Sequence, residues 1–148
     1  MRDLGAQVAA ILRPGDVVVL DGPLGAGKTT FTQGIGRALE VRGPVTSPTF
    51  VIARSHPGPR GSLVHVDAYR LSAVEVDDLD LDADLSSAVT VVEWGAGKVE
   101  GLAPDRLEVL IRRAVGSPVD PHDPSGGSRT VSVRGIGPRW AGLSLPAG

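Results

Sequence analysis

Apolar residues change their spacing along the chain, and that spacing predicts where helices and strands lie. From residue 2 to 12 they recur every three or four positions, which predicts an amphipathic helix ending at a Pro-Gly pair. Residues 16–21 form a nearly continuous apolar run, as expected of a strand buried on both faces. A Gly-rich turn follows, and helical spacing returns over residues 28–41, with Gly34 and Gly36 weakening the middle. The pattern therefore predicts helix, buried strand, turn and helix.

Shorter segments later in the chain have the patterns of strands. Residues 50–53 and 62–66 flank the Pro- and Gly-rich stretch 55–61, which predicts a hairpin. Residues 89–93 form another apolar run that ends in an acid, and residues 107–112 alternate apolar with polar. Strands therefore dominate this part of the chain.

The last part of the chain combines one more strand with two irregular segments. Residues 129–133 alternate apolar with polar, which predicts a strand. The Pro-, Gly- and Ser-rich stretch 116–128 is predicted to be a flexible loop, and residues 140–148 a disordered tail. Together the patterns predict a single α/β domain over residues 1–148, built around a mixed sheet.

Composition narrows the class of protein without pointing to a chemistry. Hydrophobic residues are 41% of the 148 residues and aromatic residues 3%, so the core is expected to be mainly aliphatic. Cysteine is absent, which excludes disulfides and thiolate metal sites and fits a reducing cytoplasm. No apolar run approaches the roughly 20 residues of a membrane span, and no leader-like segment precedes the first strand. We therefore expect a cytoplasmic protein that does not enter a membrane.

Charge argues against tight, direct binding to nucleic acid. The formal net charge is −2, and the basic residues are scattered rather than gathered in a patch. Residues 72–85 hold six acids and no base. We interpret this acidic run mainly as a solvated face, with partner docking as the second interpretation.

Residues 22–29 match the phosphate-binding loop template, Gly-x4-Gly-Lys-Thr. The match lies between a predicted buried strand and a predicted helix, which is the context that the motif requires. Backbone N–H groups of such a loop point at phosphates, aided by the N-terminus of the next helix. Lys28 is expected to reach the β- and γ-phosphates, and the Thr29 hydroxyl to ligate Mg²⁺. The motif thus predicts a P-loop NTPase-like three-layer sandwich with a mixed sheet.

Two acids at the ends of predicted strands are candidates for the chemistry. Asp67 follows the strand at residues 62–66, and Glu93 ends the strand at residues 89–93. Ligands of open α/β sheets bind beyond the carboxyl ends of strands, and a P-loop enzyme needs a carboxylate near Mg²⁺ or its attacking water. Asp67 and Glu93 are therefore expected to lie near the phosphates.

The nucleotide is predicted to be ATP rather than GTP. The chain contains no Asn, so it lacks the Asn-Lys-x-Asp motif that reads guanine, and no D-x-x-G begins at Asp67. A kinase would need an acceptor site, usually beneath an Arg-rich lid, and residues 116–128 contain no Arg. A small-molecule kinase is therefore disfavoured but stays open.

Four short stretches together resemble one family. They are 22-GPLGAGKTT-30, 46-TSPTF-50, 65-HVDAYR-70 and 92-VEW-94. In order and spacing they are similar to the TsaE (formerly YjeE) family, the small ATPase subunits of the bacterial machinery that makes threonylcarbamoyladenosine (t6A) in tRNA. Each stretch alone is a modest signal, whereas four in sequence are specific.

The resemblance implies roles for the matching residues. Lys28, Asp67 and Glu93 would be catalytic, and Thr29, Asp67 and Glu93 would lie near Mg²⁺. Ser47 and Thr49 would belong to a switch segment that senses the γ-phosphate. The residues implied in ATP binding are Leu24, Gly25, Ala26, Gly27, Lys28, Thr29, Thr30, Trp94 and Arg129.

Three other motif residues are given a structural interpretation, and one stretch departs from the family pattern. His65, Tyr69 and Arg70 are interpreted as structural rather than catalytic. Many members read Glu-Trp-Pro-Glu, whereas Gly95 and Ala96 follow the Glu-Trp pair here, so the second acid is missing.

The resemblance also implies partners. The chain would be a Mg²⁺-dependent ATPase, slow alone, that assists two related carbamoyl-transfer subunits of the TsaB and TsaD type. It would meet tRNA only through that complex, so 148 residues need not hold a second substrate. An ATP-binding regulatory module without significant hydrolysis is the other alternative that stays open.

Overall fold

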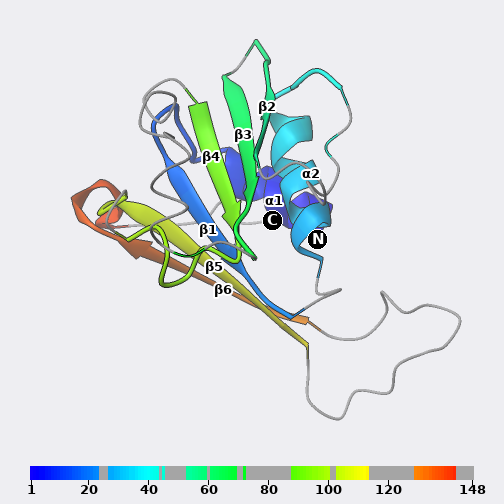
Figure 1. Ribbon diagram of the computed structural model, residues 1–148. Helices are drawn as coiled ribbons and strands as arrows, with labels where there is room; N and C mark the ends of the chain where they lie inside the picture. Colours follow the sequence, from blue (N-terminus) through cyan, green and yellow to red (C-terminus); the bar gives the residue numbers. More distant parts are fainter. Residues whose placement is uncertain are drawn as a thin grey trace, which may run out of the picture.

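The described strands of the computed structural model form one sheet in the order β2-β3-β4-β1-β5-β6 (Figure 1). The four central strands run parallel, and the edge strands β2 and β6 are antiparallel to their neighbours. The strands are Val17–Asp21 (β1), Ala53–His56 (β2), Ser62–Asp67 (β3), Ala88–Glu93 (β4), Arg106–Arg113 (β5) and Arg129–Ile136 (β6). The helices are Arg2–Ala9 (α1), Lys28–Ala38 (α2) and the 3-10 turn Pro138–Trp140 (η1). The structure describes residues 1–23, 27–43, 45, 53–59, 61–69, 72, 88–100, 103–113 and 129–142.

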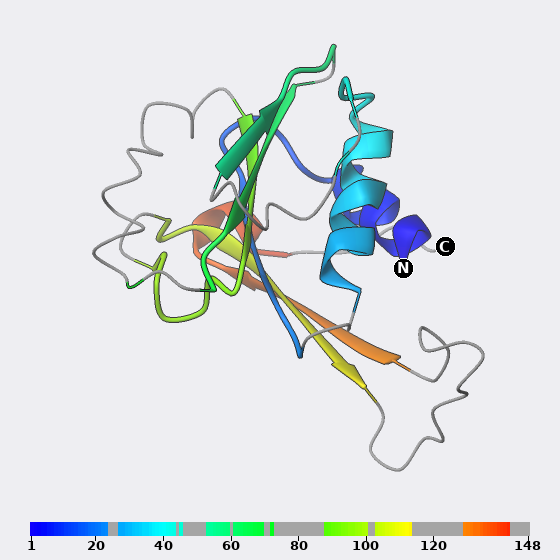
Figure 2. The same ribbon diagram turned by 45° about the vertical axis from the view of Figure 1, so that its right-hand side comes forward.

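Helices α1 and α2 pack on the same face of the sheet (Figure 2), and two glycines allow them to approach closely. A Cβ on Gly5 would lie 2.1 Å from the Phe31 carbonyl oxygen, and a Cβ on Gly34 would lie 2.1 Å from the Arg2 carbonyl oxygen. Neither position leaves room for a side chain. Gly34, which weakens the helix when only its propensity is considered, is therefore required where the two helices meet.

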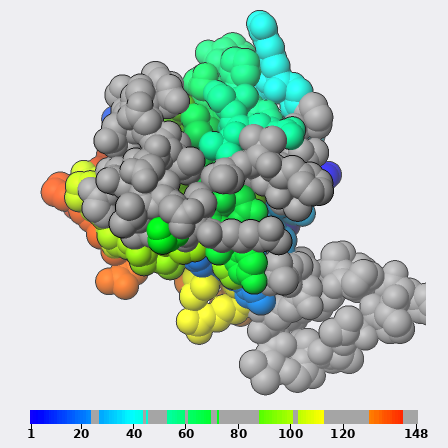
Figure 3. Space-filling model, in the orientation of Figure 1, coloured from blue at the N-terminus to red at the C-terminus, as the bar shows by residue number. Residues whose placement is uncertain are grey.

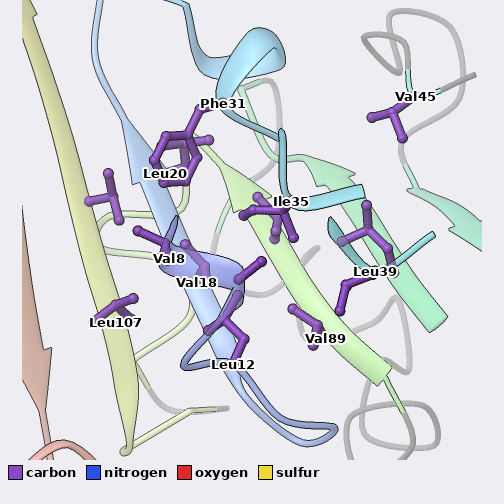
Figure 4. Packing of buried hydrophobic residues seen from close by; sticks show 14 of the residues in the cluster. Val8, Leu12, Val18, Leu20, Phe31, Ile35, Leu39, Val45, Val89 and Leu107 are labelled. Atoms are coloured by element: carbon purple, nitrogen blue, oxygen red, sulfur yellow. The ribbon is translucent and has the colours of Figure 1, made fainter. Parts of the chain in front are cut away.

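The sheet carries an apolar layer on each face. On the helix side, Val18 and Leu20 of β1 pack with Phe31 of α2 (Figure 4). Val17 and Val19 alternate with them and belong to a separate cluster on the opposite face. Successive strand residues point to opposite faces, so a strand that is apolar at every position is covered on both sides. This arrangement confirms the predicted α/β class and the buried central strand.

The predicted hairpin is confirmed, and its first strand continues past the predicted end at residue 53, while residues 50–52 lie outside the described residues. β2 runs from Ala53 to His56, so it includes the first two residues of the predicted connection. The antiparallel pairing continues to His56, which lies opposite Leu63, and stops before Pro57, which has no N–H to donate. In Figure 3 this hairpin lies at the top of the molecule, and β6 lies at the lower left, across the sheet from it.

The helices are shorter than the apolar spacing predicted. α1 ends at Ala9 instead of residue 12, because the chain tightens into hydrogen bonds between residues three apart, such as that from the Leu12 N–H to the Ala9 carbonyl at 3.1 Å. α2 ends at Ala38 rather than near Val41. The N-terminal bounds of both helices agree with the prediction.

The end of the described chain is more ordered than predicted. β6 extends to Ile136, three residues beyond the predicted strand, and Ile136 lies opposite Arg106 of β5. Trp140 was predicted to begin a disordered tail, but it is 5% exposed and belongs to the helix-side core. The prediction is wrong for this residue, because a large aromatic side chain at the edge of the core gains more from burial than from solvent.

Several predicted segments lie outside the described residues. They are the switch segment 46–50, most of the acidic run 72–85, the loop 116–128 and the tail beyond residue 142. Among the helices that the structure does describe, none is long and apolar enough to cross a membrane.

Candidate functional site

The phosphate-loop motif joins the end of β1 to the start of α2. Gly27 is the N-cap of α2 and has a φ of 105°, a backbone conformation that side chains with a Cβ rarely adopt. Its carbonyl accepts the first helical hydrogen bond, from Phe31 at 2.9 Å. Lys28, Thr29 and Thr30 therefore occupy the first turn of α2, where backbone N–H groups and the helix dipole favour an anion.

The side chain of Lys28 folds back onto the loop. Its Nζ donates hydrogen bonds to the carbonyl oxygens of Gly22 at 2.7 Å and Pro23 at 3.0 Å. The same nitrogen lies 3.9 Å from the centre of the Trp94 ring, a cation–π contact. Lys28 is only 6% exposed, so its ammonium group is held inside the site.

The charge of Lys28 is balanced by acids at three strand ends. Burial lowers the pKa of Lys28, whereas the negative charges of Glu93, Asp21 and Asp67 act in the opposite direction. These acids end β4, β1 and β3, which are neighbours in the sheet. The predicted convergence of Lys28, Asp67 and Glu93 at one sheet edge is therefore observed.

Asp67 and Glu93 are paired by the register of the sheet. They lie opposite each other on β3 and β4, and Glu93 also lies opposite Leu20 of β1. The Asp67 carboxylate accepts the N–H of Tyr69 at 3.0 Å, and the Glu93 carboxylate is hydrogen-bonded to Nε2 of His65. Glu93 is 4% exposed, so it is a buried carboxylate at the end of β4, beside the end of β1.

Trp94 closes this edge of the site. Its φ is 62°, unusual for a bulky residue, and its N–H is bonded to the Leu20 carbonyl at 2.9 Å. The turn carries its ring over Lys28 and against Tyr69, with ring centres 4.9 Å apart and planes inclined by 56°. Tyr69 is 54% exposed, so this aromatic pair lies at the mouth of the site.

Three further polar residues belong to the site although they were not predicted there. Asp21 ends β1, and burial raises the pKa of its carboxyl, opposed by a hydrogen bond with the Ala96 backbone and by Lys28. Lys98 donates to the carbonyl of Ala68, just after Asp67. His65, interpreted as structural, contacts Glu93 itself. Asp21 could have been found from its position as the last residue before the phosphate loop.

The structure does not describe five of the predicted site residues. Leu24, Gly25, Ala26, Ser47 and Thr49 lie outside the described residues.

Arg129 is the first residue of β6 and lies opposite Arg113 of β5. Arg113 comes three residues after Leu110 on β5, and Leu110 lies opposite Asp21, the last residue of β1. The backbone of Arg129 is therefore at the same sheet edge as the phosphate loop.

The donor set fits Mg²⁺ held together with a nucleotide. Among the described residues, no group of three or more His, Asp and Glu residues is arranged to hold a metal ion. Mg²⁺ commonly keeps several waters and binds one or two carboxylates plus substrate phosphates, so it needs no complete cage of protein ligands. The residues available at this edge are Asp67, Glu93 and the hydroxyl of Thr29, all oxygen donors.

Comparison with known proteins supports the identification of the family. The family model described as "Threonylcarbamoyl adenosine biosynthesis protein TsaE" matches residues 1–117. The chain is 59% identical over 145 residues to the tRNA threonylcarbamoyladenosine biosynthesis protein TsaE of Streptomyces coelicolor, covering 95% of this chain and 94% of that protein. It is 43% identical to the TsaE protein of Bacillus subtilis over 107 residues, covering 72% of this chain and 67% of that protein.

A solved structure agrees with the sequence relatives. The crystal structure of Bacillus subtilis YdiB superposes with a TM-score of 0.72 at 32% identity, covering 96% of this chain and 82% of that one. Sequence and fold thus agree with the resemblance carried by the four motifs, and the chain belongs to the TsaE family.

Proposed function

We infer that the chain binds ATP with Mg²⁺ and hydrolyses it as the ATPase subunit of the machinery that makes threonylcarbamoyladenosine in tRNA. The observation that carries this is the meeting of Lys28 with the carboxylates of Asp67 and Glu93 at one edge of the sheet, in a chain of the TsaE family. Proteins of this family carry that biosynthetic role in their names. The expected place of action is the cytoplasm.

Lys28 supplies the positive charge for the phosphates. In the described structure its ammonium group donates hydrogen bonds to the carbonyl oxygens of Gly22 and Pro23. An incoming triphosphate offers stronger, charged acceptors, so Lys28 exchanges these two neutral bonds for the β- and γ-phosphate oxygens. The neighbouring backbone N–H groups at the start of α2 complete the cradle.

The two carboxylates serve the reacting end of the nucleotide. Asp67 and Glu93, with the Thr29 hydroxyl, would hold Mg²⁺, which neutralises charge on the phosphates when bound. Glu93 would also orient the attacking water, because its carboxylate is buried at the end of β4 and is held by a hydrogen bond to His65. Trp94 and Tyr69 form an aromatic wall that limits water at the mouth of the site.

The proposed partners are the two carbamoyl-transfer subunits of the TsaB and TsaD type, with tRNA bound by the complex. Phosphoryl transfer is usually accelerated by an arginine that stabilises charge on the γ-phosphate, and it is often supplied by another protein. Neither residues 22–30 nor residues 46–50 contain arginine. Slow hydrolysis alone and faster hydrolysis in the complex therefore follow from the proposal.

Single-turnover hydrolysis of γ-labelled ATP tests the proposal. The chain is measured alone, with the two carbamoyl-transfer subunits, and with candidate small-molecule acceptors. Release of inorganic phosphate that is accelerated by the subunits is expected. Transfer of the label to an acceptor would indicate a kinase, and ATP binding without phosphate release in any mixture would indicate a regulatory module.

A further inference from the structure

His65 is a fully buried histidine with one described side-chain hydrogen bond. Its side chain is 0% exposed, and its Nε2 is hydrogen-bonded to Oε2 of Glu93. An ionised carboxylate only accepts hydrogen bonds, so Nε2 carries the proton in this contact. Nδ1 has no partner among the described residues. Among the described residues, the imidazole therefore forms a hydrogen bond with Glu93 alone.

The surroundings of His65 make a polar side chain costly there. His65 lies between Leu63 and Asp67 along the same face of β3, and it is opposite Val91 of β4. Leu63 and Val91 belong to the helix-side core. A leucine at position 65 would continue this apolar layer, whereas an imidazole with an unpartnered nitrogen loses hydration. The bond to Glu93 is the described contact that distinguishes histidine from an apolar residue at this position.

We propose that His65 is a positioning residue for the reaction, which holds the Glu93 carboxylate in the orientation that the γ-phosphate end of the site requires. The bond fixes Oε2 on the core side, so it turns the second carboxylate oxygen, Oε1, away from the imidazole. A buried carboxylate on a flexible side chain would otherwise sample several rotamers, and a group supporting the reacting atoms has to be held closely. This inference rests on the proposed ATPase function, and it concerns the same site.

A second buried histidine provides a matched control. His56 on β2 is 5% exposed, lies on the same face of the sheet and also has an unpartnered nitrogen, Nε2. It has no described hydrogen bond to Glu93 or Asp67. Replacing His56 therefore removes a buried imidazole from the same layer without touching the carboxylates.

The bond itself is tested without nucleotide. The full chain is labelled with ¹⁵N-histidine, which reports on His56, His65 and His122 only. We expect a slowly exchanging Nε2–H signal that disappears in His65→Gln, moves in Glu93→Ala and stays in place in His56→Gln. An unchanged His65 ring spectrum in Glu93→Ala would overturn the contact on which the proposal depends.

The positioning role is tested by where a donor is placed. In His65→Gln the amide nitrogen reaches about the position of Nε2, whereas in His65→Asn the shorter side chain reaches only about that of Nδ1. His65→Leu carries no donor. Single-turnover hydrolysis in the presence of the partner subunits is expected to fall about 10- to 100-fold in His65→Asn and His65→Leu. His65→Gln should recover most of the loss, and the Kd for ATP should change far less than the rate in all three variants.

The parent chain, Glu93→Ala and His56→Leu are measured beside the His65 variants. The outcomes therefore separate the positioning role of His65 from the proposed ATPase function. Equal rates in His65→Gln and His65→Asn would overturn the positioning role, because the donor's place would not matter, even if His65→Leu failed to fold. Hydrolysis lost in Glu93→Ala but normal in every folded His65 variant would overturn this inference alone. No hydrolysis by the parent with its partners would overturn the proposed function, while the ¹⁵N spectra still decide the contact.

Discussion

Two buried carboxylates at opposite ends of the central strands have very different surroundings. Asp16, just before β1, is 7% exposed and accepts three hydrogen bonds. Arg139 donates one to each carboxylate oxygen, at 3.1 and 3.0 Å, and the Arg13 N–H donates the third at 2.7 Å. Glu93, at the end of β4, has a described side-chain hydrogen bond to His65. Among the described residues, similar burial therefore accompanies a carboxylate with three hydrogen bonds at one end and one with a single side-chain hydrogen bond at the other.

The difference separates a carboxylate that holds the fold from one that is available for chemistry. Arg139 also donates to the Ile11 carbonyl at 3.0 Å and lies 4.1 Å from the Trp140 ring, so the Asp16 pair ties the 3-10 turn η1 to the turn after α1. A buried charge whose two oxygens are both held by hydrogen bonds has little left to offer a ligand. In the described part of the chain, Glu93 has one side-chain hydrogen bond and lies near Lys28, where the proposed nucleotide would bring new partners.

The largest effect is expected from removing the cation beside Glu93. Lys28→Ala should reduce hydrolysis at least about 100-fold and weaken ATP binding, because charge developing on the phosphates loses its compensation. Single-turnover hydrolysis and equilibrium ATP binding measure both effects. Unchanged affinity together with unchanged turnover would mean that the loop does not bind phosphates.

Truncating the carboxylates of the site should affect the rate more than binding. Glu93→Ala and Asp67→Ala are expected to lower single-turnover hydrolysis about 10- to 100-fold while ATP affinity changes less, because these groups act mainly in the transition state. The thermal stability of each variant is measured beside the rate, because Glu93→Ala leaves the buried His65 without its described hydrogen-bond partner. Parent-like hydrolysis in both variants would contradict the interpretation of these strand ends.

The same truncation at Asp16 should show the reverse pattern. Asp16→Ala leaves the partly buried Arg139 without its carboxylate, so we expect the free energy of unfolding to fall by about 2 kcal/mol. Hydrolysis per folded molecule should be unchanged. Urea unfolding together with the ATPase assay checks both, and Arg139→Ala should reproduce the loss of stability. A stable but inactive Asp16→Ala variant would remove the contrast between the two carboxylates.

The smallest effect concerns a buried polar residue with neither role, His56. Burial lowers its pKa from the ordinary value of 6.5, reinforced by His65 and Arg54 and opposed by a hydrogen bond with the Arg42 backbone. The unfolded chain therefore binds this proton at a higher pH than the folded one, so the stabilising effect of keeping His56 neutral is complete above pH 6.5 and is lost as the pH falls below it.

His56→Gln isolates this contribution. Urea unfolding at a series of pH values between 7.5 and 5.5 should show stability that falls less steeply in the variant than in the parent. Hydrolysis at pH 7.5 should be the same in both. Parallel stability profiles would mean that His56 is not kept neutral by the fold.

Local patterns were sufficient to predict much of this molecule. The glycines and Lys28 of the phosphate loop are adjacent in sequence, and their role depends on a strand before them and a helix after them. Asp67 and Glu93 were found because carboxyl ends of parallel strands meet at one edge, a rule that needs only the strand bounds. The central strands and the starts of both helices were predicted for the same reason: their apolar periodicity depends on near neighbours in the chain.

Only the tertiary structure decided which distant residues meet. The contacts of His65 with Glu93, of Lys98 with the Ala68 carbonyl and of Arg139 with Asp16 join residues 28, 30 and 123 positions apart. No local pattern distinguishes a histidine that supports a carboxylate from one that fills a core.

Gly34 shows the same division. Sequence propensity marks it as a weak point of α2, whereas in the fold its missing side chain lets the backbone of Arg2 pass at close range. Propensity, periodicity and motifs describe a chain segment and its immediate neighbours. Close packing and the bonding of buried polar groups depend on strand order and register, which bring together residues that the linear sequence keeps apart.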